Sequence, residues 1–280
     1  MKNLPFLFAM VLSSNPLFTQ AEGSLPLEPH AIQTRIGQIA VYQRVVPNTV
    51  PVIFIHGVYY DHHLWNYYTE RIQDRTVISV DMPLHGKSKN IPLKNWQLED
   101  CAQMLIDILD QLGHSEAYAI GHSWGSMTIL RAAAKHPDRF KAIGLCNMPV
   151  AQASLSQKLA FGFQHLMLPF RKFYTGQVSK VMFSAASRAA RPELKNYLES
   201  TMSLLSQREI RKTDRAVITQ ADDGQLYLQT LQVPALALKG EEDYVPRLQQ
   251  IETTVIPGAH TSPLERPKEV LIFIQRVLRE

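Results

Sequence analysis

Short runs of apolar residues, many of them β-branched, alternate along the chain with longer stretches in which apolar residues recur every three or four positions. The short runs predict strands at residues 52–55, 76–80, 117–120, 142–145, 235–239 and 253–256, with an antiparallel strand or hairpin at 36–45. The longer stretches predict helices at residues 96–112, 124–135 and 267–278, the first with Asn95 as its N-cap and Gly113 as its stop. Such alternation is typical of βαβ units. The pattern therefore predicts an α/β fold with a mostly parallel central sheet flanked by helices.

The alternation stops between residues 150 and 231, where the sequence is helical in pattern and rich in aromatic residues. Residues 150–220 contain eleven Lys or Arg and four Asp or Glu, whereas the whole chain has a net charge of only +4. We interpret residues 150–231 as a basic helical cap inserted into a core formed by 22–149 and 232–280. The basic cap favours an anionic substrate or peripheral contact with an anionic membrane; the alternative is a solvated basic helix face.

The first 21 residues have the layout of a secretory signal peptide. Lys2 precedes an apolar run at residues 4–12, and the small residues Thr19 and Ala21 stand where a signal peptidase reads, so cleavage is expected after Ala21. This predicts a secreted or periplasmic protein. The alternatives are an N-terminal strand or a short anchor, and a cytoplasmic protein if no signal is present.

Composition excludes several classes of protein. With 45% apolar and 19% charged residues the chain is too apolar to be disordered, and two cysteines cannot form a disulfide scaffold. Both cysteines, Cys101 and Cys146, are expected to be buried free thiols. No apolar run approaches the roughly 20 residues of a membrane-spanning helix. No long Lys/Arg run indicates nucleic-acid binding.

A nucleophile motif follows the strand predicted at 117–120. Residues 121–125 read Gly-His-Ser-Trp-Gly and lead into a predicted helix, which is the G-x-S-x-G pattern in its strand–turn–helix context. The glycines allow a sharp turn that presents Ser123 at the carboxyl edge of the sheet. The alternative is an ordinary turn in which Ser123 only caps the helix.

A serine nucleophile needs a base and an acid that orients the base, and both follow later strands. Asp243 comes just after the strand at 235–239, and His260 follows the strand at 253–256. Other acids nearby are Glu241, Glu242, Asp222 and Asp223, and His165 is the other histidine well after the serine. The order serine, acid, histidine predicts a catalytic triad of Ser123, Asp243 and His260.

The loop after residues 52–55 supplies the remaining candidates for the site. Two backbone N–H groups, of Val58 and Trp124, are expected to form the oxyanion hole. The candidate substrate contacts are Tyr59, Tyr60, Phe161, Phe163 and Met167. The alternative for the three cap residues among them is that they pack the cap onto the core. His56 is expected to tie the loop to its neighbours. Adjacent His62 and His63 beside Asp61 could suggest a metal, but adjacent residues rarely ligate one ion, and no metal is expected.

Four motifs make the chain resemble the cap-bearing members of the α/β-hydrolase superfamily over residues 32–280. They are His56-Gly57, residues 81–88, the Ser123 turn, and the pair Asp243 and His260. Residues 81–88 read Asp-Met-Pro-Leu-His-Gly-Lys-Ser, similar to the family's D-x-P-G-x-G-x-S turn with Leu84 in place of glycine. Glu265 and Pro267 resemble the family's structural segment after the histidine. The resemblance implies a serine hydrolase of carboxylic esters, lactones or thioesters, acting on a small molecule without a metal or organic cofactor.

The resemblance leaves several activities open. Carbon–carbon bond hydrolases and cofactor-free perhydrolases of the haloperoxidase type use the same triad, and some members of the fold bind ligands without catalysis. Haloalkane dehalogenases and epoxide hydrolases use an aspartate where this chain has Ser123. Proline iminopeptidases have a similar nucleophile turn, but their glycine- and proline-rich oxyanion loop is replaced here by residues 58–61. The oligomeric state is expected to be a monomer or homodimer.

Overall fold

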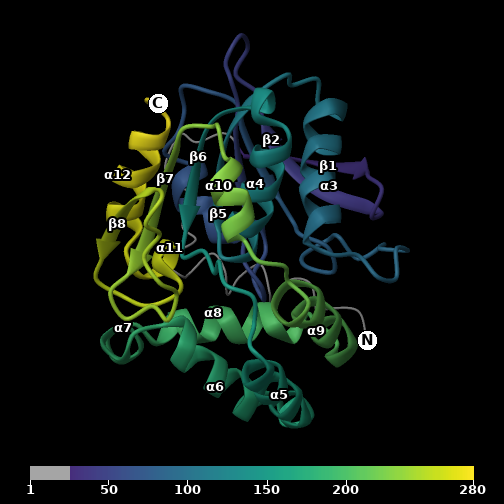
Figure 1. Ribbon diagram of the computed structural model, residues 1–280, viewed down its shortest axis with the longest axis vertical. Helices are drawn as coiled ribbons and strands as arrows, with labels where there is room; N and C mark the ends of the chain where they lie inside the picture. The colour runs from purple at the N-terminus through teal and green to yellow at the C-terminus, as the bar shows by residue number, and fades with distance from the viewer. Residues whose placement is uncertain (1–25) are drawn as a thin grey trace.

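The computed structural model describes residues 26–280, so the signal peptide expected at 1–21 lies outside the described residues. Eight strands form one sheet in the order β1-β2-β4-β3-β5-β6-β7-β8 (Figure 1). The strands are β1 (Glu28–Gln33), β2 (Gln38–Arg44), β3 (Val52–Ile55), β4 (Val77–Val80), β5 (Ala117–His122), β6 (Phe140–Cys146), β7 (Ala235–Gly240) and β8 (Glu252–Ile256). β1 and β2 are antiparallel to their neighbours, and β4, β3, β5, β6, β7 and β8 run parallel. The predicted mostly parallel sheet is confirmed.

Helices cover the sheet. Helix α3 (Leu98–Gln111) packs against α4 (Trp124–Lys135), and α12 (Pro267–Val277) packs against β6, β7 and the short helix α2 (Asn66–Thr69). All four residues of β3 and of β4 are buried, as expected for strands covered on both faces. Cys101 and Cys146 are buried free thiols, as predicted. Between residues 26 and 280 no helix is long and apolar enough to cross a bilayer.

The first turn of α3 differs from its prediction. The N-cap is Gln97 rather than Asn95, because the Asp100 side chain accepts a hydrogen bond from the Gln97 backbone N–H at 2.9 Å and closes a capping box. The predicted stop is confirmed: Gly113 adopts a left-handed φ of 75°, and His114 N–H bonds back to the Leu109 carbonyl at 2.9 Å.

The chain between β6 and β7 is helical. It forms α5 (Leu155–Gln164), η3 (His165–Met167), α6 (Arg171–Met182), α7 (Ala185–Ala190), α8 (Pro192–Ser203), α9 (Gln207–Asp214), the π-helix η4 (Arg215–Thr219) and α10 (Gln225–Thr230). We call α5 to α9 the cap helices. They lie together at one end of the sheet, whereas α10 packs beside α4 (Figure 1).

The carboxyl edge of the parallel sheet lies under the cap helices. The backbone N–H of Thr261, in the loop after β8, bonds to the Met182 carbonyl at the end of α6 at 2.9 Å. The Ser184 N–H, just after α6, bonds to the Glu265 carboxylate at 2.9 Å. Since β5, β7 and β8 all end at this edge, the residues that follow them meet beneath the cap.

Candidate active site

Ser123 occupies the sharp turn between β5 and α4. Its φ of 50° and ψ of −109° lie outside the ordinary regions for a residue with a side chain. A Cβ on Gly121 would lie 2.4 Å from the Ser126 backbone nitrogen, and one on Gly125 would lie 2.1 Å from the Ile55 carbonyl oxygen. Glycine is therefore required on both sides of Ser123, and the turn is compressed against the end of β3.

A chain of hydrogen bonds joins Ser123, His260 and Asp243. The Ser123 Oγ and His260 Nε2 are 2.9 Å apart, and His260 Nδ1 is 2.9 Å from Asp243 Oδ1. An ionised carboxylate only accepts hydrogen bonds, so Nδ1 carries the proton and Nε2 accepts from the serine hydroxyl. Ser123 is 5% exposed and His260 1% exposed. The structure thus brings together the three residues predicted from chain order.

Asp243 is held as a carboxylate by several donors. Burial alone would raise its pKa, but hydrogen bonds from His260, Asn147 and the Val245 N–H outweigh burial and leave the pKa below its usual value. The Asn147 side-chain nitrogen donates to Asp243 Oδ2 at 2.7 Å. Sequence reasoning missed Asn147; its signal was its position directly after β6, at the edge where the other site residues gather.

Two buried side chains fix the loop that carries His260. His122 Nε2 donates to the His260 carbonyl at 2.8 Å, and burial, with the nearby His260, lowers the pKa of His122 to about 3, so the ring is neutral. Glu265 accepts from the Ala259 N–H at 2.7 Å. The structural role expected of Glu265 therefore lies in holding the residue before His260.

The loop after β3 is pressed against the Ser123 turn. A Cβ on Gly57 would lie 2.5 Å from His122 Nδ1, so only glycine allows this approach. Within residues 26–280, the backbone N–H groups of Val58 and Trp124 make no hydrogen bond. His56 Nε2 accepts from the Met82 N–H at 2.9 Å and so ties the loop to the residues after β4, as predicted. Two free N–H groups next to the serine have the chemistry that a developing oxyanion requires.

The five candidate substrate contacts are placed differently from one another. Tyr59 and Tyr60 are buried; the Tyr59 hydroxyl donates to Asp214 at 2.9 Å, and the Tyr60 hydroxyl lies 3.0 Å from Thr261 Oγ1. Both hydroxyls are thus engaged within the protein.

The cap candidates are less buried. Phe161 is half-buried, Met167 packs partly against the core, and Phe163 is 70% exposed on α5. Since α5 has no buried residue, Phe163 faces solvent rather than a closed pocket.

Tyr244 is a neighbour of the site that the sequence reasoning did not identify. Its ring stacks on the His260 ring with centroids 4.7 Å apart, and its hydroxyl lies 3.5 Å from His260 Nε2. Tyr244 is 62% exposed. It therefore forms the solvent-facing side of the Ser123–His260 pair. The only sequence signal was its position next to Asp243.

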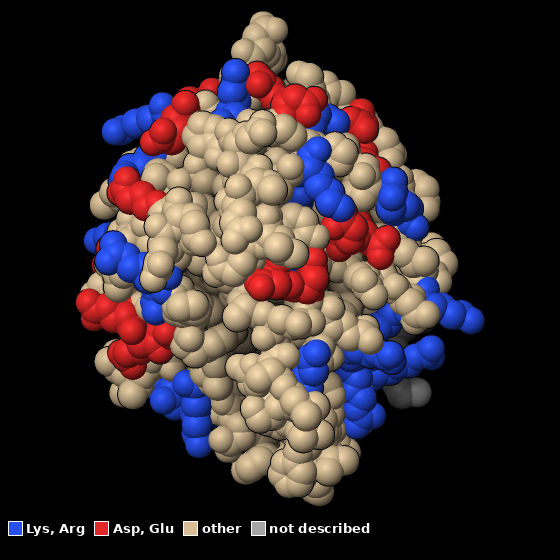
Figure 2. All heavy atoms as spheres, viewed as in Figure 1, with Lys and Arg blue, Asp and Glu red and all other residues tan. Residues whose placement is uncertain are grey.

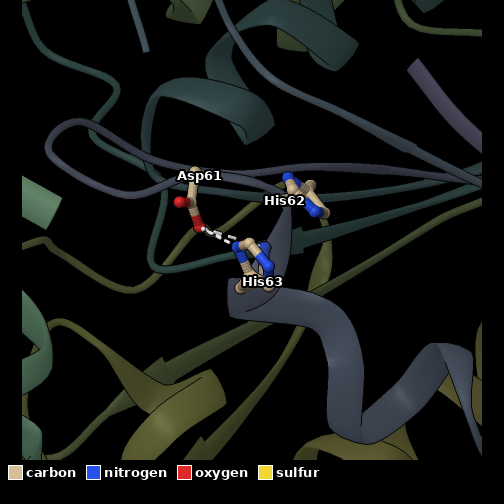
Figure 3. A group of neighbouring side chains, drawn as sticks. All are labelled: Asp61, His62 and His63. Atoms are coloured by element: carbon tan, nitrogen blue, oxygen red, sulfur yellow. Dashed lines mark hydrogen bonds and ion pairs between the residues drawn. The ribbon is translucent and has the colours of Figure 1, made fainter. Parts of the chain in front are cut away.

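Asp61, His62 and His63 form the one group of metal-type donors in the described part of the chain, with donor atoms within 4.8 Å of one another. Figure 3 shows the Asp61 carboxylate facing His63, with His62 to one side. His63 Nδ1 is 3.1 Å from Asp61, and His62 Nδ1 is 2.8 Å from Asp81. Each imidazole is thus already paired with a carboxylate. Asp61 also accepts from the Tyr197 hydroxyl of α8 at 3.1 Å, so the group joins the core to the cap.

The Asp61–His63 pair predicts a pH-dependent stability. Burial alone would raise the pKa of Asp61, but the nearby His63 outweighs burial and leaves this pKa below its usual value. Burial alone would lower the pKa of His63, but Asp61 outweighs burial and leaves this pKa above its usual value. The Asp61 contribution is present above its unfolded pKa near ~4 and is lost as the pH falls through the lower folded value. The His63 contribution is present below its unfolded pKa near ~6.5 and is lost as the pH rises through the higher folded value.

We therefore expect Asp61→Asn to reduce the free energy of unfolding by about 1–3 kcal/mol, and most strongly between about pH 4 and 6.5. Urea denaturation of both proteins across pH 4 to 9 measures the difference. Asp74→Asn is the matched control, because the Asp74 side chain is 72% exposed. A difference that stays constant across this range would contradict the coupling.

Comparison with known proteins agrees with the fold. A family model described as "alpha/beta hydrolase fold" matches residues 50–253. The chain is 31% identical over 105 residues to "Esterase YbfF" of Escherichia coli (strain K12), covering 37% of this chain and 41% of that protein. It is 34% identical over 74 residues to "Bifunctional epoxide hydrolase 2" of Sus scrofa, covering 26% of this chain and 13% of that protein. The aligned segments thus span less than half of the length of these curated relatives.

Solved structures match over most of the chain. A thermophilic esterase from Thermogutta terrifontis superposes with a TM-score of 0.77 at 22% identity, covering 90% of this chain and 98% of that chain. The enol-lactonase from Burkholderia xenovorans LB400 superposes with a TM-score of 0.76 at 18% identity, covering 86% of this chain and 97% of that chain. At 18% and 22% sequence identity, these two matches show a shared fold. Together with the family model over residues 50–253, it establishes that the chain belongs to the α/β-hydrolase fold family.

Proposed function

We propose that this protein is a serine hydrolase that cleaves a carboxylic ester, or a related lactone or thioester, through an acyl-enzyme on Ser123. The observation that carries the proposal is the pair of 2.9 Å contacts that link Ser123 Oγ to His260 and His260 to Asp243. The strained backbone of Ser123 supports the proposal, because a hydroxyl that served only as a helix cap would not need this conformation.

Each residue has one task in this mechanism. His260 Nε2 takes the proton as Ser123 Oγ attacks the carbonyl carbon, and then delivers that proton to the leaving alcohol. Asp243 keeps the other ring nitrogen protonated and stabilises the imidazolium that forms. The N–H groups of Val58 and Trp124 donate to the oxyanion of the tetrahedral intermediate. Water, activated by His260, then releases the acid and restores Ser123.

The relatives support the choice of an acyl substrate. An esterase and a "2-(acetamidomethylene)succinate hydrolase" of Mesorhizobium japonicum are among them, the latter 30% identical over 117 residues. The pig epoxide hydrolase is also a relative, but an epoxide hydrolase of this family attacks with a carboxylate, and this chain has a hydroxyl at position 123.

The proposal predicts turnover of simple acyl esters by the full chain. We expect hydrolysis of p-nitrophenyl acetate, and labelling of Ser123 by a fluorophosphonate, located by peptide mass spectrometry. Longer p-nitrophenyl esters then define the acyl length that the site accepts. p-Nitrophenyl sulfate is the control, because its hydrolysis does not pass through an acyl-enzyme. Absence of both turnover and labelling would overturn the proposal.

A further inference from the structure

The outer part of the cap, from residue 150 to residue 192, has an excess of positive charge. Residues 150–192 contain six Lys or Arg and no Asp or Glu. In the view of Figure 2, Lys and Arg flank the end of the molecule formed by α5 and α6, and the Asp and Glu visible on this face lie farther from that end. A merely solvated surface normally mixes both signs.

The same part of the cap exposes large apolar side chains. Seven of the thirteen large apolar side chains that are exposed between residues 26 and 280 lie within residues 155–181, and each is between 51% and 74% exposed. They are Leu155, Leu159, Phe163, Leu166, Phe170, Phe173 and Val181. On α5 the first three are spaced four residues apart, so they share one face of a helix in which no residue is buried. A concentration of apolar side chains of this kind marks a surface that is covered in use.

A cavity opens among these charges. It has a volume of about 370 Å³, and its lining includes Lys172, Lys180, Arg188, Lys195 and Phe173. These cations come from three different helices, α6, α7 and α8. In the described chain the one ion pair among the four joins Lys195 to Glu199 at 3.3 Å, and both side chains are partly exposed. The cavity therefore concentrates cations around an opening large enough for a phosphodiester group.

We propose that the outer face of the cap helices docks on an anionic phospholipid bilayer. Its exposed apolar side chains enter the interfacial region, and the lysine-lined cavity receives the phosphodiester of an anionic lipid. Charge complementarity favours this occupant, because a basic face with Leu and Phe on adjacent positions has the composition of helices that lie in a membrane interface. The inference does not depend on the proposed ester hydrolysis, since none of these residues touches Ser123, His260 or Asp243.

Co-sedimentation of the full chain with vesicles tests the proposal. We expect binding to vesicles of mixed phosphatidylcholine and phosphatidylglycerol, weaker binding to phosphatidylcholine alone, and release at high salt. The triple variant K172Q/K180Q/K195Q should bind the phosphatidylglycerol vesicles at least about tenfold less tightly. The variant L155S/L159S should weaken binding to both kinds of vesicle. Both variants replace side chains at the cap surface, so the unfolding midpoint and any ester turnover in solution should match those of the wild type.

A second triple variant controls for net charge. K135Q/K141Q/K268Q removes the same three charges from exposed positions on the core and should bind as the wild type does. The proposal would be overturned if the two triple variants lost vesicle binding equally, or if K172Q/K180Q/K195Q bound the vesicles as tightly as the wild type. So would tight binding of inorganic phosphate, measured by calorimetry, without vesicle binding. A lipid-free dimer that L155S/L159S dissociates, seen by sedimentation velocity, would assign the apolar face to a second copy and also overturn the proposal.

Discussion

Replacing Ser123 by alanine is expected to lower kcat for a p-nitrophenyl ester by roughly 10⁶-fold, with KM changed little. The variant keeps the fold and the free N–H groups of the oxyanion loop but has no nucleophile, so no acyl-enzyme forms. The serine hydroxyl is also the group that His260 Nε2 contacts at 2.9 Å, so the variant loses the proposed nucleophile and its contact with the proposed base together. Steady-state kinetics of the purified full chain measure the change in kcat.

Ser126→Ala is the matched control for this prediction. Ser126 lies in the same turn, but its hydroxyl donates to the Cys146 carbonyl at 3.0 Å and does not contact His260. Its loss should cost about 1 kcal/mol of stability and leave kcat within about tenfold of the wild type. A Ser123→Ala variant whose kcat also stayed within about tenfold would assign the nucleophile elsewhere.

The second large effect is expected for Asp243→Asn, which should lower kcat by about 10⁴-fold. The carboxylate accepts from His260, Asn147 and the Val245 N–H, so an amide at this position must turn its NH₂ group toward one of these donors. Where it faces His260, the ring holds the wrong tautomer and Nε2 can no longer accept the serine proton. The pH dependence of kcat, measured together with the unfolding midpoint, separates loss of the base from loss of the fold.

Glu242→Gln provides the comparison for Asp243→Asn. Glu242 is the preceding residue, it is exposed, and the same change of charge occurs there. We expect it to leave kcat unaltered. If Glu242→Gln reduced turnover as much as Asp243→Asn, the assignment of Asp243 as the acid that orients His260 would be wrong.

The central sheet and the three candidate triad residues could be predicted because their signals are local. Each strand is a short apolar run, and Ser123, Asp243 and His260 each follow such a run in a fixed order. Strand β1 could not be resolved separately, because only one of its six residues is buried and no apolar alternation marks it. It is held by backbone pairing with β2 instead.

The supporting residues depend on neighbours that are distant in sequence. Asn147 gains its role from Asp243, 96 residues later, and no local pattern encodes that contact. In the same way, the aromatic residues after the β3 loop suggested a substrate surface, but their hydroxyls are bound to Asp214 and Thr261. Position in the chain indicated that Tyr59 and Tyr60 lie near the site, whereas the partner of each hydroxyl depends on residues that are distant in sequence.

The hydrogen bonds between cap and core have a consequence for how the molecule can vary. Asp214 holds Tyr59, next to the oxyanion loop, and the end of α6 holds Thr261, next to His260. The cap is therefore hydrogen-bonded to both loops that carry candidate site residues, the loop after β3 and the loop after β8. Displacing the cap would disturb both loops together, so we expect substrate to enter on the side where Tyr244 is exposed. New substrate preferences in such a protein are expected to arise by exchange of single side chains along that entrance, whereas lengthening or shortening the cap would cost turnover first.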